Sequence, residues 1–362
     1  MHSIHWCAGC TTAAFTRRQV LLALAGAATA VVLPRPARAF TILSSSQEEE
    51  IGRNAHKEIL QRFGALDSPS LQAYVARMGQ RLVEEAEYTG FEYHFTALNT
   101  PEVNAFALPG GFIYVTRGLL AEANSEAELA TVVGHEIGHV TSHHAAKQLT
   151  RAFGLQFLTL GLIALSPGGR EHAGKWATLS GELFSRILLG YGRDAELESD
   201  EKGIRYAFRA GYDARQMVNF FRVLQLKARL AGVDYHAFSA THPDTIERID
   251  RARVLGDVIG PGAAGESRVA ADEYKARLEG LPYGEKGSGK RLRIHTVAPG
   301  ETLPAIVRQA YGSEARAYEV ALLNGLRRED APLAPGQRLK LVVEGTPGGS
   351  LRLEPKPPEA GR

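Results

Sequence analysis

The sequence HEIGH at residues 135–139 lies inside the run ELATVVGHEIGHVTSHHAAKQL (128–149), which reads as one helix. Two histidines four positions apart lie on the same helical face. The ring nitrogens of His135 and His139 can therefore bind one zinc ion at about 2.0–2.1 Å each. Glu136 points toward the same metal and can take a proton from water, which is the role of a general base in peptide hydrolysis.

The sequence before this motif favours a metal site over a chance match. HExxH alone is expected by chance in roughly a few per cent of chains of this size. The preceding residues LATVVG (129–134) are apolar, which predicts a buried helix rather than a surface helix that happens to carry two histidines. Two imidazoles and a carboxylate are costly to bury without partners.

A second segment offers the remaining ligand. Zinc bound by two histidines needs a third protein ligand and an open position for water. In GYGRDAELESDEKGIRYAF (190–208), Glu196 and Asp200 share a helical face, whereas Glu198 faces elsewhere. We predict Glu196 as the third ligand and Asp200 as the acceptor of a hydrogen bond from a ligand histidine. A solvated acidic helix would show the same spacing.

The segment EVNAFALPGGFIYVTRGLL (102–120) predicts a pair of strands. Residues 112–115 alternate as a strand does, and LPGG before them is typical of a turn. Two strands beside the zinc helix would leave an unpaired edge, to which an extended peptide can add as a further strand. An ordinary core hairpin is the alternative.

Four motifs, in this order, resemble the HtpX/BepA/Oma-type zinc metallopeptidases, relatives of the CaaX prenyl protease. They cover about residues 45–255 and comprise NAFALPGGFIYVTRGLL, ELATVVGHEIGHVTSHH, YGRDAELESDEKGIRYAFRAGYD and THPDTIERI. The resemblance implies an α+β, mainly helical protease domain of the zincin (gluzincin) type. In such a domain a small β-sheet edge lies beside the HExxH helix.

The resemblance also implies roles for single residues. One Zn²⁺ per chain would be bound by His135, His139 and Glu196, with Glu136 as general base and Asp200 as the family's aspartate. Arg193 matches an arginine that usually precedes the ligand glutamate. The edge that receives substrate would consist of Asn104, Ala105, Phe106 and Ala107.

His242, in ATHPDTIERIDRAR (240–253), has two interpretations. His-Pro before a helix is an ordinary helix start, and Asp244 can serve as an acid in the first turn. In BepA-like proteins the matching histidine can reach the metal as a fourth ligand in a closed, resting form. By resemblance, His242 is a candidate metal ligand or oxyanion stabiliser. His143 and His144 are expected to flank the ligands.

The N-terminal residues predict an export signal that is cleaved after residue 39. A positive start precedes an apolar run at 20–33 and the small-residue site Ala37-Arg38-Ala39. Arg17-Arg18 before the apolar run resembles the twin-arginine pattern, and an ordinary secretory signal is the alternative. The run is shorter than the roughly 20 residues that a membrane span requires. We therefore expect an exported, periplasmic protein.

The mature chain is expected to lack both cysteines, because Cys7 and Cys10 lie in the leader. Loss of four leader arginines changes the formal net charge from +2 to −2, and nothing in that balance suggests a nucleic-acid partner. Residues 153–165 form the remaining apolar run, which is too short to cross a bilayer. No membrane span is expected in the mature chain.

The chain after the leader is long enough for two domains. We predict a protease domain at 40–257, a linker at 258–290, a module at 291–344 and a disordered tail at 345–362. The module reads as strand, helix, helix, strand. It resembles a LysM-type βααβ domain through VAPGETL, LLNGL and LAPGQRLK. That resemblance implies binding to peptidoglycan, and a packing domain without a ligand is the alternative.

Taken together, the resemblance implies a zinc metalloendopeptidase of the bacterial envelope. Its partners would be misfolded or misassembled envelope proteins as substrates, and peptidoglycan through residues 291–344. One alternative is a chaperone-like assembly factor with little proteolysis. Another is a peptidoglycan-associated hydrolase, although no pair of acidic residues stands out as a glycosidase pair.

Overall fold

The structure, a computed structural model, describes residues 43–151, 190–231, 241–242, 246–259 and 267–344. The predicted leader, the apolar run at 153–165 and the predicted tail lie outside these ranges. All described residues belong to one compact unit, Thr41–Arg362. No described helix is long and apolar enough to cross a lipid bilayer.

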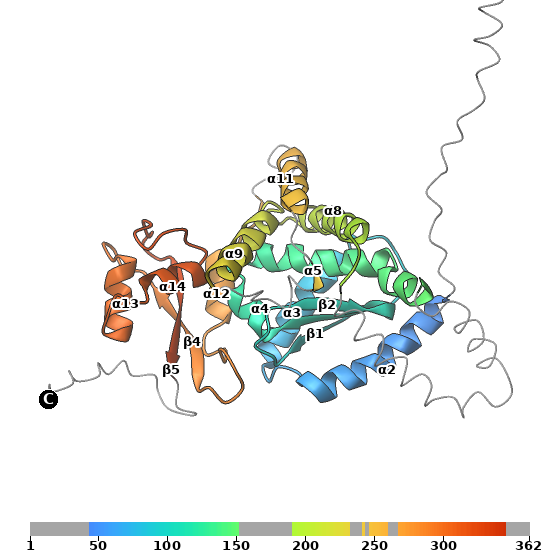
Figure 1. The fold of residues 1–362 in the computed structure, drawn as a ribbon, viewed down its shortest axis with the longest axis horizontal. Helices are drawn as coiled ribbons and strands as arrows, with labels where there is room; N and C mark the ends of the chain where they lie inside the picture. Colours follow the sequence, from blue (N-terminus) through green and yellow to red (C-terminus); the bar gives the residue numbers. More distant parts are fainter. Residues whose placement is uncertain (1–42, 152–189, 232–240, 243–245, 260–266, 345–362) are drawn as a thin grey trace, which may run out of the picture. The chain divides into compact units, whose positions relative to one another are not determined.

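The described elements are mainly helices (Figure 1). They are α2 (Ser45–Phe63), α3 (Pro69–Val83), β1 (His94–Leu98), β2 (Ala105–Leu108), the 3₁₀ turn η1 (Pro109–Gly111), β3 (Phe112–Thr116), α4 (Arg117–Glu122), α5 (Glu126–Thr141), α8 (Arg193–Arg209), α9 (Gln216–Ala231), α11 (Ile246–Ile259), α12 (Ala271–Arg277), β4 (Lys290–Thr296), α13 (Leu303–Tyr311), α14 (Ala317–Leu323) and β5 (Arg338–Glu344).

A three-stranded sheet separates two helical layers. Its order is β1-β3-β2, with β1 parallel and β2 antiparallel to β3. Side chains alternate between its faces. One face, including Phe106 and Tyr114, packs on α2. The other face, including Ala107 and Ile113, packs on α3 and α5. The predicted strand pair is present, and β1 is an additional strand.

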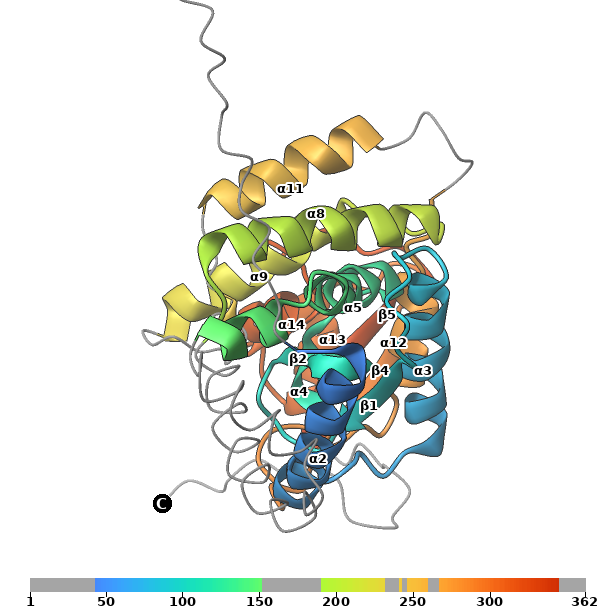
Figure 2. The same cartoon turned by 90° about the vertical axis from the view of Figure 1, so that its right-hand side faces the viewer.

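Helix α5 carries the HEIGH sequence and lies directly against α8, with α11 beyond α8 (Figure 2). Glycines allow this close approach. A Cβ atom on Gly203 would lie 2.6 Å from the backbone nitrogen of His135, and one on Gly138 would lie 3.0 Å from the Cα of Ser199. The first distance is too short for any Cβ atom, and the second would push Ser199 away by a few tenths of an ångström. The two glycines thus let α8 bring its carboxylates to the histidines of α5.

The run 128–149 is not one helix, which corrects the prediction above. Helix α5 ends at Thr141, and His143 has a positive φ of 51°, after which the chain becomes helical again. The Ser142 hydroxyl donates a hydrogen bond to Glu198 of α8, 2.6 Å away. Because of this interruption the side chain of His144 contacts His139. In a continuous helix these two residues, five positions apart, would lie on different faces.

Residues 290–344 form the expected strand, helix, helix, strand sequence. β4 and β5 pair antiparallel, and a small core of side chains, including Leu303, Val307 and Leu339, lies between the helices and the strands. These features fit the βααβ arrangement, and whether the unit is a LysM domain stays a prediction.

Within the segment predicted as a linker, residues 258–259 belong to α11, and residues 267–289 pack on the protease region. Tyr274 is buried in the main core and donates a hydrogen bond to the carbonyl oxygen of Leu120, at 2.7 Å. The guanidinium of Arg117 donates to the carbonyl oxygens of Pro282 and Gly284, at 2.7 and 3.0 Å. Residues 267–289 therefore hold the βααβ unit against the protease region, and the domain boundaries stay a prediction.

Candidate metal centre

Four buried side chains converge beside α5. His135 and His139 come from α5, Glu196 from the first turn of α8, and His242 from the segment before α11. One ligand atom of each lies within 4.8 Å of the others. The structure thus brings the three predicted ligands together with His242, the residue for which the sequence left two interpretations.

The spacing of these atoms fits a tetrahedral ion. Donors about 2.0–2.1 Å from a central zinc would lie about 3.3 Å from one another. The Nε2 atoms of His135 and His139 are 2.9 Å apart, and Nδ1 of His242 lies 3.2 Å from Nε2 of His135. Glu196 oxygens lie 3.5 Å from both Nε2 atoms and 3.1 Å from Nδ1 of His242. Three imidazoles and one carboxylate are also a donor set that zinc accepts.

The outer nitrogen of His135 is held by a buried carboxylate. Its Nδ1 lies 2.8 Å from Oδ1 of Asp200. An N–H donated there leaves Nε2 free of a proton and directed at the metal position. Asp200 in turn accepts two hydrogen bonds from Arg248, at 2.7 and 2.8 Å.

The outer nitrogen of His139 has a different partner. Its Nδ1 lies 2.9 Å from Nδ1 of His144, and Nε2 of His144 lies 3.4 Å from Oε2 of Glu198. Burial lowers the pKa of His144 to about 4, so its ring is neutral near pH 7 and can accept the proton that His139 donates. Glu198 therefore faces away from the cluster and supports it through His144.

The charges in the cluster balance one another. Burial alone would raise the pKa of Glu196, but the charge of His242 and hydrogen bonds from the imidazoles hold that pKa well below its usual value. Burial would lower the pKa of His135, but hydrogen bonds to Asp200 and Glu196 raise it to about 9. Burial lowers the pKa of His139. The contacts with the imidazoles favour the ionised, metal-binding form of Glu196.

Glu136 lies next to the cluster, and its carboxylate is available to accept a proton. Neither of its oxygens receives a hydrogen bond from a described residue, although Oε1 lies 3.4 Å from Nε2 of His242. Burial raises the pKa of its carboxyl group. A buried carboxylate of raised pKa is a better proton acceptor than an exposed one.

Asn104 to Ala107 lie at the edge of the sheet next to α5. Among the described strands β2 pairs with β3 alone, so its other edge faces away from the sheet. The Oδ1 atom of Asn104 accepts a hydrogen bond from the Thr241 hydroxyl at 3.2 Å, which links this edge to the residue before His242. Ala105, Phe106 and Ala107 are buried, and their role toward substrate stays a prediction.

Two residues near the ligands were missed from the sequence. Arg248 is 1% exposed, and besides Asp200 it pairs with Glu196, its Nη1 lying 2.9 Å from Oε2. It lies in the THPDTIERI motif, six positions after His242, so a search for buried cations near that histidine could have found it. Tyr191 stacks on the ring of His139 with 4.1 Å between ring centroids, and no sequence pattern indicated this.

His143 and Arg193, which the sequence analysis also named, lie further from the cluster. His143 is partly exposed, and its Nδ1 lies 2.9 Å from Oε1 of Glu48 on α2. Arg193, which matched the family arginine, is mostly exposed and forms an ion pair with Glu247 of α11. Neither residue reaches the cluster directly.

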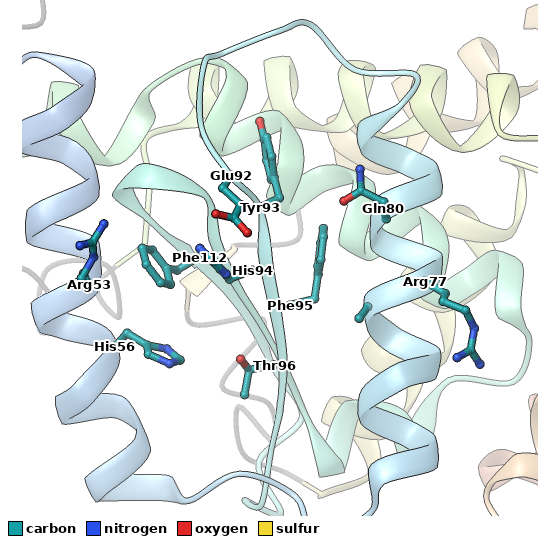
Figure 3. Close-up of a pocket in the computed structure, with 11 residues that line it drawn as sticks. Arg53, His56, Arg77, Gln80, Glu92, Tyr93, His94, Phe95, Thr96 and Phe112 are labelled. Atoms are coloured by element: carbon teal, nitrogen blue, oxygen red, sulfur yellow. The ribbon is translucent and has the colours of Figure 1, made fainter.

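A separate groove lies over the outer edge of β1, away from the cluster (Figure 3). It has a volume of about 770 Å³, with Arg53 and His56 of α2 on one side and Arg77 and Gln80 of α3 on the other. It contains none of the four cluster residues. Its size therefore says nothing about chemistry at the candidate metal centre.

Comparison with known proteins also indicates a peptidase. The model of Peptidase family M48 matches residues 69–255, about half of the chain. The beta-barrel assembly-enhancing protease of Escherichia coli strain K12 is 30% identical over 301 residues, covering 80% of this chain and 60% of that protein. The protein of the same name from Yersinia pestis is 27% identical over 304 residues, covering 82% of this chain and 61% of that one.

A eukaryotic relative is also similar. The mitochondrial metalloendopeptidase OMA1 of Schizosaccharomyces pombe is 28% identical over 218 residues, covering 59% of this chain and 62% of that protein. This chain thus spans only about three-fifths of the length of these relatives. The matched range contains both cluster helices and His242, and the chain belongs to peptidase family M48.

Proposed function

We propose that this chain is a zinc-dependent metalloendopeptidase of the bacterial cell envelope. The observation that carries the proposal is the convergence of His135, His139, Glu196 and His242 around one point, with Glu136 beside them. Bound there, zinc would act as a Lewis acid and make water acidic enough to react near neutral pH.

The chain's own residues would then move the protons. Glu136 would accept the proton from the attacking water and later deliver it to the leaving amine. Asp200 and His144 would hold the ligand imidazoles in the tautomers whose Nε2 atoms face the ion. Arg248 would keep Glu196 and Asp200 ionised in a buried setting.

His242 bears directly on this activity. With His242 as a ligand, protein atoms fill all four positions of a tetrahedral site, which is the arrangement of a closed site. Water would reach the ion only if His242 withdraws or if the ion takes a fifth ligand. We therefore assign His242 to the resting site, as a ligand that limits access of water.

The proposed substrates are misfolded or misassembled envelope proteins. The name of the Escherichia coli relative links that protein to beta-barrel assembly. The edge at Asn104 to Ala107 supports a substrate bound as an extended strand, because backbone hydrogen bonds to an edge tolerate many side chains. A chaperone-like assembly factor with little proteolysis is the second candidate, favoured by the closed ligand set.

The proposed location is the periplasm, reached through the leader at residues 1–39, with peptidoglycan as a partner of residues 291–344. Replacing Arg17 and Arg18 by lysine should block export if the twin-arginine route is used. Normal export of that variant, or a mature N-terminus far from Phe40, would contradict this part of the proposal. Sedimentation of the full chain with purified peptidoglycan tests the partner, with a Lys286-truncated chain as control.

The activity is tested by incubating purified protein with an unfolded model protein, with and without a chelator. The proposal predicts cleavage that the chelator abolishes and zinc restores. Suppressed aggregation without cleavage would favour the chaperone-like alternative. Release of soluble fragments from purified peptidoglycan, without cleavage of protein, would favour the glycan hydrolase.

A further inference from the structure

A second cavity, of about 590 Å³, lies where the βααβ unit meets the protease region. Its wall is formed by the start of α5, by α9, by α12 and by the end of α14 with the turn that follows it. Four side chains that line it carry the argument. They are Lys275, Asn124, Arg222 and Arg327.

Lys275 is a buried cation without a hydrogen-bonding partner. Its side chain belongs to α12 and the residue is 4% exposed. Among the described residues its ammonium group forms no hydrogen bond and no ion pair, and the carboxylates that act on it electrostatically are those of Asp272 and Glu128. Burying an unpaired ammonium is costly, because the charge loses its hydration. Burial accordingly lowers the pKa of Lys275.

Asn124 adds a buried polar atom that lacks a partner. The residue is 7% exposed and precedes the N-cap of α5. Its side-chain nitrogen donates to the carbonyl oxygen of Glu122 at 3.2 Å, but its Oδ1 has no hydrogen-bonding partner. Buried polar groups in folded proteins are nearly always satisfied, so this atom leaves a residue of the cavity wall with an unmet hydrogen bond.

Two more cations line the same cavity. Arg222 comes from α9 and Arg327 from the turn after α14, and neither pairs with a described residue. By contrast, Arg316 and Arg328 of the same βααβ unit both pair with nearby carboxylates.

The cavity wall carries one carboxylate, that of Glu128. One of its oxygens already accepts a hydrogen bond from the backbone nitrogen of Asn124, at 2.7 Å. In the cavity wall Lys275, Arg222 and Arg327 outnumber this single acid, although Asp272 also acts on Lys275 from outside the wall.

From this arrangement we propose that the cavity is a binding site for a small anion bearing a carboxylate or a phosphate group. Lys275 of α12 would donate a charge-assisted hydrogen bond to the anion. Arg222 of α9 and Arg327 of the turn after α14 would add two further positive charges beside it. Since α9, α12 and the turn after α14 all contribute, a bound anion would tie the βααβ unit to the protease region.

The test is calorimetric titration of the full chain at constant ionic strength. One arm uses inorganic phosphate. Another uses a short peptide with a free C-terminal carboxylate, and the same peptide with an amidated C-terminus is its control. We expect saturable binding in at least one of the first two arms, with a dissociation constant of roughly millimolar order or tighter. Binding of the free but not the amidated peptide identifies a carboxylate, and binding of phosphate alone identifies a phosphate group.

Variants connect the binding to this cavity. Lys275→Met should weaken binding by roughly tenfold or more, because a charged hydrogen bond is lost. Arg222→Gln and Arg327→Gln change exposed residues and should each weaken it by roughly three- to tenfold. Lys286→Gln, a matched cation change on an exposed loop outside the cavity, should bind as the unchanged chain does.

Two results would overturn the proposal. One is the lack of saturable binding to the unchanged chain in both arms. The other is equal binding by Arg222→Gln, Arg327→Gln and Lys286→Gln, which would place the anion elsewhere. The arginine variants decide the question even if Lys275→Met fails to fold, because their side chains are exposed.

Discussion

Arg248 at the metal centre and Lys340 at the junction with the βααβ unit are both fully buried cations, but they are satisfied in different ways. Arg248 pairs with the carboxylates of Asp200 and Glu196. Lys340 is 0% exposed and donates to three backbone carbonyl oxygens, those of Ala121, Glu122 and Ala123, at 2.8, 3.2 and 2.8 Å. The first cation fixes charged side chains around a reactive site, whereas the second fixes the backbone at the end of α4.

The difference shows how each region depends on its surroundings. At the metal centre Arg248 pairs with the buried carboxylates of Glu196 and Asp200, so its loss would leave two buried charges without their cation. At the junction Lys340 donates to three neutral carbonyl oxygens, which cost less to leave unpaired than a charged group does. We therefore expect changes at the metal centre to be the more damaging.

The largest effect on metal binding is expected at Glu196. Glu196→Ala should weaken zinc binding by roughly a hundredfold or more, because it removes a ligand, whereas Glu198→Ala should weaken it by roughly tenfold at most, since it acts only through His144. Metal content after dialysis against a weak chelator measures this. Retention of zinc by Glu196→Ala and its loss by Glu198→Ala would reverse the assignment.

Removing the cation of the metal centre should have the next largest effect. Arg248→Leu leaves Asp200 and Glu196 buried without their cation, and the free energy of unfolding should fall by roughly 3–5 kcal/mol. Arg251→Leu, in the same helix but exposed, is the control and should change it by less than about 1 kcal/mol. Denaturant unfolding of the zinc-free chains measures both. Equal stability of the two variants would show that Arg248 is not needed by the carboxylates.

The metal centre was largely predictable from the sequence, because its ligands come from two short helical motifs with fixed spacing. Arg248 was not, since only the packing of α11 on α8 brings it to Asp200. The interruption at His143 was also missed, because periodicity cannot reveal a single residue of positive φ. β1 was missed because it pairs in parallel with β3, and strand β2 lies between the two in sequence.

The junction was much less predictable. The Gly-rich stretches GPGAAGESR (260–268) and EKGSGKR (285–291) suggested a flexible linker, but Tyr274 and Leu281 between them are buried in the main core. A lysine in a strand normally faces solvent, and nothing near Lys340 in sequence indicates that α4 ends beside it. Contacts between residues far apart in sequence therefore determine which residues are buried at the junction, and the local sequence pattern does not predict them.

Lys340→Met tests the junction and should have a smaller effect than Arg248→Leu. The apolar stem is kept, and three carbonyl oxygens lose their donor, so the free energy of unfolding should fall by roughly 1–3 kcal/mol. Lys290→Met, at the exposed end of β4, serves as the matched control. Unchanged stability of Lys340→Met would indicate that water replaces the ammonium and that the junction is loose.

The smallest effect is expected for a cap inside the βααβ unit. The Thr302 hydroxyl accepts a hydrogen bond from the backbone nitrogen of Ala305 at the start of α13. Thr302→Ala should lower the free energy of unfolding by about 1 kcal/mol. Zinc content should not change, because no metal ligand lies in this unit. Loss of zinc from Thr302→Ala would show that the unit and the metal centre are tightly coupled.

The most direct test of the central claim is the zinc content and peptidase activity of Glu136→Gln. The amide keeps the shape of the side chain but cannot accept the proton of the attacking water. We predict stoichiometric zinc and a loss of activity of roughly a hundredfold or more, whereas Glu201→Gln, on the exposed side of α8, keeps full activity. Stoichiometric zinc with wild-type turnover in Glu136→Gln would contradict the assignment of Glu136 as the base.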